Sequence, residues 1–355
     1  MTFIHGCNYL WSTDGTTVFY GLDFGANVWG SHLGVSTRRP AIERDFAEMA
    51  ALGFTAVRWF LFCDGRAGIV FDDRGLPAEP DPHLFADLDT ALEIARGAGI
   101  RIAFVLLDHR WMFKGVRDTF ADPVTGDLLE GRLPDGRARV LLTAAGQDAL
   151  FDRVLEPLIR RYGLDGERAD LAAQVLAYEL MNEPDFVIEE WEQDLSTHVA
   201  TPLPFAIIME LVARLSACVH RHSQALTTLG GARLRNLWAW DDNALGLDLL
   251  QVHSYPDRNH PERDGDPFGT AARDLGFARP LLLGEFPGNP REHPAGASPP
   301  ERDLDEYLAF ALAGGYAGAW PWSFSGTDAY GRLPVEPLQR FAQRYPELVN
   351  PRRRA

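Results

Sequence analysis

Two apolar stretches, about a hundred residues apart, decide the fold of this chain. The first reads Val175-Leu-Ala-Tyr-Glu-Leu-Met-Asn-Glu-Pro-Asp185, and the second reads Pro280-Leu-Leu-Leu-Gly-Glu-Phe-Pro-Gly288. Each stretch has the length of a buried strand and ends in a glutamate that is followed by proline or by Phe-Pro. Two strands that each deliver a carboxylate at the carboxyl end predict a pair of carboxylates facing across a cleft.

Strand-like and helix-like segments alternate along the rest of the chain. Eight segments are strand-like, at residues 4–10, 54–62, 100–107, 174–181, 225–229, 249–253, 280–283 and 316–322. Helical spacing covers residues 40–52, 84–98, 147–162, 205–222 and 304–313, and these segments mostly end at glycine. Several strands are apolar on both faces, which is typical of a parallel sheet covered by helices. The repeated βα units predict a (β/α)8 barrel.

A doubly wound sheet is the structural alternative, but no glycine-rich phosphate turn follows an early strand. Because no linker or change of composition divides the chain, residues 1–355 are predicted to form one domain. The long connections, at residues 110–143, 185–203, 256–279 and 288–302, follow strand ends and are predicted to lie at the C-terminal face of the barrel.

Composition limits the partners. The 355 residues include 50 acidic and 34 basic ones, which gives a formal net charge of -16. Such a surface repels nucleic acid and anionic membranes, so neither is expected as a partner, whereas a neutral sugar is compatible. The acidity also serves solubility, and no feature of the sequence assigns an oligomeric state.

The cysteines and the first residues of the chain indicate the cellular compartment in which the protein is expected. Cys7, Cys63 and Cys218 are too few and too widely spaced for a disulfide framework or a thiolate metal site. The first residues lack a basic segment followed by an apolar one, and no apolar run of about 18 residues occurs. We expect a cytoplasmic protein.

The two strand-end glutamates, Glu183 and Glu285, are the candidate catalytic residues. A pair of carboxylates facing across a cleft is what cleavage of a glycosidic bond requires. Glu179 lies inside the first strand, where a buried carboxylate needs a cationic partner, so its predicted role is structural support.

At these residues the chain resembles the retaining (β/α)8 glycoside hydrolases of clan A, and most of all the cellulase and mannanase family numbered five. Asn182-Glu183-Pro184 matches the acid/base element that ends strand four, and Glu285 matches the nucleophile that ends strand seven. The other matching positions are Arg58, His109, His253, Tyr255 and Trp322, with Trp320 beside it. Their order along the chain supports the resemblance, which extends from Gly6 to Phe324.

The resemblance implies a role for each matching residue. Glu285 attacks the anomeric carbon, while Arg58 and Tyr255 stabilise its charge. Glu183 donates a proton to the leaving oxygen and then acts as a base. The residues expected to bind substrate are Arg58, His109, Asn182, His253, Tyr255, Trp320 and Trp322. Trp238 and Trp240 are expected in the core.

Other chemistries lack their motifs. The first strand has no His-x-His, and neither H-E-x-x-H nor G-x-S-x-G occurs, so no metal, no cofactor and no serine nucleophile is expected.

Two alternatives to hydrolysis stay open. A transglycosylase would use the same carboxylates, and a barrel that only binds carbohydrate is the alternative from another class of protein. The sugar stays unassigned, and the long loops favour a closed pocket over an open groove.

Overall fold

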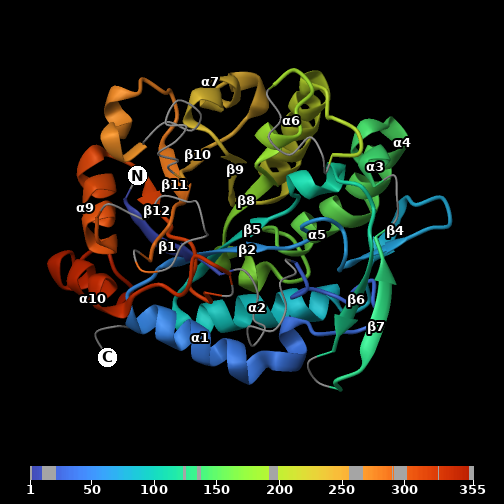
Figure 1. Ribbon diagram of the computed structural model, residues 1–355, viewed down its shortest axis with the longest axis horizontal. Helices are drawn as coiled ribbons and strands as arrows, with labels where there is room; N and C mark the ends of the chain where they lie inside the picture. The colour runs from blue at the N-terminus through green and yellow to red at the C-terminus, as the bar shows by residue number, and fades with distance from the viewer. Residues whose placement is uncertain are drawn as a thin grey trace.

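The computed structural model describes residues 2–9, 21–122, 125–133, 137–191, 199–255, 267–289, 291, 302–326 and 328–351. At its centre is a closed barrel of parallel strands surrounded by helices (Figure 1). The order around the barrel is β1-β12-β11-β10-β9-β8-β5-β2. Each strand therefore pairs with the next barrel strand along the chain, and the first pairs with the last. This topology confirms the predicted (β/α)8 barrel and excludes the doubly wound sheet.

All eight predicted strands are present, with shifted ends. They are β1 (Ile4–Asn8), β2 (Ala56–Phe60), β5 (Arg101–Val105), β8 (Val175–Asn182), β9 (Leu226–Gly231), β10 (Leu250–His253), β11 (Leu281–Glu285) and β12 (Gly318–Ala319). Because all of them are parallel, their carboxyl ends meet at one rim of the barrel.

The helices follow the predicted segments closely, except for α10 (Val335–Arg344), which was not predicted. The longer ones are α1 (Arg39–Ala51), α2 (Leu84–Ala98), α6 (Phe205–His222), α9 (Leu304–Gly314) and α10. The segment predicted as one helix over 147–162 consists of α4 (Ala144–Leu150), a π-helical turn (Phe151–Leu155) and α5 (Glu156–Arg161). Gly99 ends α2 in the left-handed conformation, with φ 69°, which a residue with a Cβ rarely adopts.

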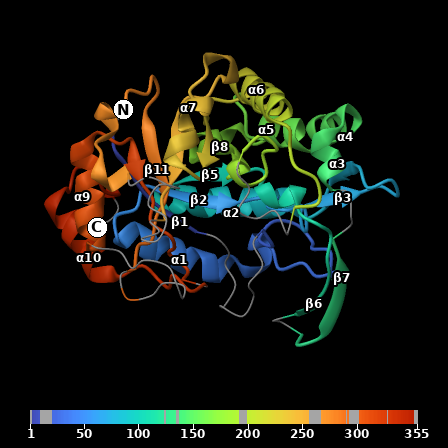
Figure 2. The same ribbon diagram turned by 45° about the horizontal axis from the view of Figure 1, so that its top comes forward.

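The connections contain structure that periodicity did not predict. A hairpin of β3 (Ile69–Phe71) and β4 (Pro77–Pro80) follows β2, and α3 (Ala138–Leu142) and α7 (Leu237–Trp240) are short helices. The connection 110–143 forms a second hairpin, β6 (Arg117–Ala121) and β7 (Leu128–Arg132), which projects from the barrel in both views (Figures 1 and 2). Large parts of the other three predicted loops, at 192–198, 256–266 and 292–301, lie outside the described residues.

Two hydrophobic clusters of the described residues build the barrel. The larger one packs the outer faces of the strands against the helices. The smaller one fills the barrel interior with Ile4, Ala56, Ala103, Leu176, Ala177, Leu282 and Trp320. Small side chains on the facing strands leave room for the indole of Trp320, as in other packed barrels.

No helix in the described part of the chain combines the length and the apolar character that crossing a bilayer requires.

Candidate active site

Glu183 stands directly after β8 in a constrained backbone. Its φ of 47° and ψ of 48° lie in the left-handed region, which costs a residue with a side chain about 1–3 kcal/mol. The backbone N–H of Glu183 donates to the carbonyl of Gly230 at 2.7 Å, and Pro184 begins the following turn. The strand end and its neighbour β9 therefore hold this carboxylate at a defined position.

Glu285 ends β11 and faces Glu183 across the rim. One carboxylate oxygen of Glu183, one oxygen of Glu285 and a ring nitrogen of His253 all lie within 4.8 Å of one another. A retaining glycosidase has its two carboxyl groups about 5–5.5 Å apart, whereas an inverting enzyme needs about 6.5–9.5 Å to admit a water. The short approach of the two oxygens fits the retaining arrangement.

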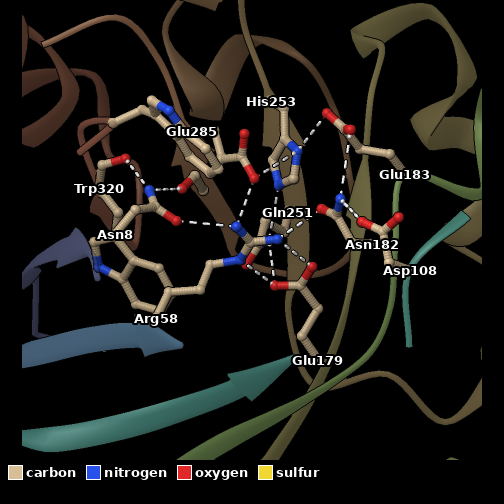
Figure 3. A network of polar contacts seen from close by, with 12 residues as sticks. Asn8, Arg58, Asp108, Glu179, Asn182, Glu183, Gln251, His253, Glu285 and Trp320 are labelled. Atoms are coloured by element: carbon tan, nitrogen blue, oxygen red, sulfur yellow. Dashed lines mark hydrogen bonds and ion pairs between the residues drawn. The ribbon is translucent and has the colours of Figure 1, made fainter. Parts of the chain in front are cut away.

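Arg58, from the middle of β2, is buried beneath the two carboxylates (Figure 3). Its Nε and Nη2 donate to the two oxygens of Glu179 at 2.5 and 2.6 Å, and its Nη1 donates to Glu285 Oε1 at 2.5 Å. Burial by itself would lower the pKa of Arg58, but the attraction of Glu179 and Glu285 outweighs it and raises that pKa. The cationic partner expected for Glu179 is therefore Arg58.

Glu285 receives donors on both of its oxygens. Arg58 bonds Oε1, and the hydroxyl of Tyr255 donates to Oε2 at 2.8 Å. Burial raises the pKa of Glu285, while His253, Arg58 and the Tyr255 hydrogen bond oppose that rise. These donors favour the ionised carboxylate that a nucleophile needs.

Glu183 has a different environment. Among the described residues, no arginine forms a hydrogen bond with it. His253 Nδ1 lies 2.9 Å from its Oε1, and Asn182 Nδ2 lies 3.4 Å from its Oε2. Although 15% of its side chain is exposed, burial raises the pKa of Glu183 to about 7, against the opposing effects of His109 and Arg58. A carboxyl group with this pKa carries a proton for part of the time at neutral pH, as a general acid must.

Asn182 and His109 lie beside Glu183. The Nδ2 of Asn182 donates to Asp108 Oδ2 at 2.7 Å, and its Oδ1 accepts from Arg58 Nη2 at 2.6 Å. The Nδ1 of His109 lies 3.4 Å from Asp108 Oδ1 and 3.9 Å from Glu183 Oε2, and burial lowers the pKa of His109. The contacts that the sequence analysis expected between these two residues and a sugar stay predictions.

The two tryptophans near the end of the barrel lie at different depths. Trp320 is 1% exposed, packs among the small side chains of the barrel interior and donates from Nε1 to the carbonyl of Ile4 at 3.3 Å. Trp322, two residues further, packs with Phe60 and Tyr255 and donates to Asp328 Oδ2 at 2.6 Å. Tyr255 also bonds Glu285, so Trp322 lies next to a residue of the catalytic site, whereas Trp320 lies in the barrel interior. The placement of Trp320 among substrate-binding residues is thus corrected to the core.

The expectation that both Trp238 and Trp240 are core residues is half right. Trp240 is fully buried, but Trp238 is 61% exposed and lies on the ring of Phe277.

Three polar residues that the sequence analysis did not select complete the site (Figure 3). Asn8, at the end of β1, donates to the carbonyls of Gly284 and Trp320 and accepts from Arg58. Asp108 orients Asn182. Gln251 connects Glu179 with His253. Asn8 and Gln251 are isolated amides within apolar strands, and that pattern is the signal by which they could have been found.

Glu183, His253 and Glu285 are also close enough together to be considered as metal ligands. A divalent cation bound there would lie next to the guanidinium of Arg58, which already bonds Glu285. The two positive charges would repel each other, so the cluster is better suited to acid–base and nucleophilic chemistry.

Comparisons with known proteins agree with this fold. No family model matches the sequence. The chain is 24% identical over 351 residues to the mannan endo-1,4-beta-mannosidase of Mytilus edulis, which covers 90% of this chain and 83% of the relative. The solved β-mannanase of that mussel superposes with a TM-score of 0.70 at 21% identity, over 97% of this chain and 91% of the mussel chain. The β-1,4-D-mannanase from Cryptopygus antarcticus superposes with a TM-score of 0.71 at 18% identity, over 96% of this chain and 89% of the Cryptopygus chain.

A (β/α)8 barrel with two facing rim glutamates defines a glycoside hydrolase of the retaining type. The predicted resemblance to family 5 of clan A and the predicted enzyme class, a glycoside hydrolase, are confirmed.

Proposed function

We propose that this chain hydrolyses β-1,4-linked mannosides, with Glu285 as the nucleophile and Glu183 as the acid/base. The observation that carries the assignment of roles is the unequal environment of the two carboxylates. Arg58 and Tyr255 donate to Glu285. In the part of the chain that the structure describes, Glu183 receives no hydrogen bond from an arginine and lies beside His253 and His109. The choice of mannose is supported by the mussel relative, whose name gives that substrate.

The geometry supports a double displacement. In the first step, an oxygen of Glu285 attacks the anomeric carbon while the proton of Glu183 passes to the departing glycosidic oxygen, which leaves a glycosyl ester on Glu285. In the second step, ionised Glu183 takes a proton from a water, and this water displaces Glu285 from the anomeric carbon. Each displacement inverts the configuration at the anomeric carbon, so after two displacements the product has the β configuration of the substrate.

The first experiment tests the substrate and the stereochemistry together. Purified enzyme is offered β-1,4-linked manno- and cello-oligosaccharides, and proton NMR follows the first product anomer. We expect faster cleavage of the manno series and initial release of the β anomer. An initial α anomer would contradict retention, and a preference for the cello series would contradict mannose as the substrate.

The second experiment separates the roles. Glu285→Ala should abolish turnover of every substrate, whereas Glu183→Ala should retain activity on substrates whose leaving group needs no proton. Added azide should rescue Glu183→Ala with a β-configured azide product and Glu285→Ala with an α-configured one. The reverse pattern would show that the two roles are exchanged.

The products also decide between a pocket and a groove. The closed pocket predicted from the long loops releases mono- or disaccharides from the start, whereas the mussel relative is named as an endo-acting enzyme. A ladder of intermediate lengths from a long β-mannan would exclude the pocket. Products longer than the substrate would indicate the transglycosylase alternative.

A further inference from the structure

A line of buried polar side chains connects Arg58 to the proposed acid/base (Figure 3). Arg58 bonds both oxygens of Glu179. The side-chain nitrogen of Gln251 lies 2.7 Å from Glu179 Oε2 and 3.0 Å from His253 Nε2. At the other side of the ring, His253 Nδ1 lies 2.9 Å from Glu183 Oε1. Gln251 and His253 are two residues apart in β10, so both point into the barrel.

The donors and acceptors fix where the protons lie along this line. The carboxylate of Glu179 forms an ion pair with Arg58 and can only accept, so Gln251 must direct its NH2 group toward it. The second N–H of that group then faces His253 Nε2, which becomes an acceptor. Burial lowers the pKa of His253 and favours the neutral ring, whose single N–H is therefore at Nδ1.

Two glycines make the room that this line requires. A Cβ at position 284 would lie 2.4 Å from Gln251 Cδ, and one at position 230 would lie 2.5 Å from Glu179 Oε1 and 3.0 Å from His253 Cε1. Glycine weakens a strand interior, so its presence at both points is explained by the close approach of these side chains.

We propose that Gln251 is a positioning residue that keeps the hydrogen of His253 on Nδ1 and thereby keeps the acidic proton of Glu183 on Oε2. With Nδ1 as a donor, Glu183 Oε1 can only accept, and a proton on this carboxyl group must sit on the other oxygen. A ring with its hydrogen on Nε2 would present a bare Nδ1 at 2.9 Å from Glu183. That nitrogen would accept the proton that the leaving oxygen needs.

The consequence for catalysis rests on the proposed role of Glu183, but the tautomer of His253 does not. A direct measurement therefore comes first. Nitrogen NMR of enzyme with 15N-labelled histidine distinguishes the two ring nitrogens, and His253→Ala identifies the signals of this ring among the ten histidines. The measurement is made at a pH of about 5.5, where Glu183 carries its proton because its pKa is about 7.

We expect the hydrogen on Nδ1 in the wild-type enzyme and a redistribution toward Nε2 in Gln251→Met, which preserves the length of the side chain without its donor. A hydrogen on Nε2 in the wild type, or an unchanged tautomer in Gln251→Met, would overturn the proposal. If Gln251→Met does not fold, the wild-type spectrum alone decides.

A kinetic test separates positioning from general damage. Gln251→Met should lower kcat/KM about tenfold on a manno-oligosaccharide, whose leaving oxygen needs a proton, and less than about twofold on dinitrophenyl β-mannobioside, whose leaving group does not. The matched control is Gln147→Met, since Gln147 donates to the carbonyl of Leu141 outside the barrel and should change neither value.

An equal loss on the two substrates would assign Gln251 a purely structural role and overturn the proposal. If the wild-type enzyme cleaves no mannoside, the proposed substrate fails while the tautomer result stands on its own.

Discussion

Replacing Glu183 by glutamine should reveal how much the ionisation of this buried carboxyl group lowers the free energy of unfolding. Burial raises the pKa of Glu183 to about 7 from an ordinary value of 4.5. The native state therefore holds its proton more tightly than the unfolded chain, and the free energy of unfolding falls as pH rises from about 4.5 to about 7. At about 1.36 kcal/mol per pKa unit, this loss amounts to about 3 kcal/mol above pH 7.

Glutamine stays neutral at every pH and keeps the size of the side chain. The free energy of unfolding of Glu183→Gln should therefore not show this fall with rising pH. The quantity to measure is the difference in stability between variant and wild type at a pH of about 8, minus the same difference at a pH of about 4.5. This subtraction cancels any packing change that does not depend on pH. For a chain of 355 residues, about 3 kcal/mol corresponds to about 4 °C in Tm.

Thermal unfolding of both proteins across this pH range is the assay. Glu347→Gln, which changes an exposed glutamate near the C-terminus, is the matched control and should give no such difference. A difference below about 1 °C for Glu183→Gln, or one that grows toward acid pH, would refute the argument that burial of Glu183 is costly.

The remaining predictions concern the tryptophans, the pH profile and metals. Trp322→Ala should lower kcat/KM by about ten- to a few hundred-fold, since one aromatic contact to a sugar is worth about 1–3 kcal/mol; an unchanged value would remove Trp322 from the substrate site. Trp320→Ala should instead cost about 3–5 kcal/mol of stability, measured by denaturant unfolding, because it empties the barrel interior. The kcat/KM of the wild type should fall as pH rises above about 7, where Glu183 loses its proton, and a profile flat to a pH of about 9 would contradict that role. Treatment with EDTA should leave activity unchanged, and a loss restored by a divalent cation would reveal a metal role for the cluster of Glu183, His253 and Glu285.

Much of the fold could be predicted from local patterns. The eight apolar strand segments and the helices that end at glycine follow from spacing that each segment carries by itself, and all eight strands are present in the structure. The helix predicted over 147–162 was interrupted by a π-helical turn, and the hairpin of β6 and β7 was not predicted. The hairpin contacts a distant part of the chain, where Trp29 donates to the carbonyl of Asp118 and packs on Phe120, and such contacts arise only from the tertiary structure.

The sequence by itself determined the class of chemistry, because Glu183 and Glu285 each end an apolar strand and parallel strands bring their carboxyl ends to one rim. Tertiary structure alone decided how the two carboxylates differ. Arg58 comes from β2, whereas His253 and Tyr255 come from the end of β10, far away in the sequence. The distances of these side chains to the two glutamates set which glutamate stays ionised. The tertiary structure also decided how deeply Trp320 and Trp322 are buried. It likewise decided the hydrogen bonds that join Glu179 through Gln251 to His253. Burial and hydrogen bonding depend on distances between strands, and these distances exist only once the barrel has closed.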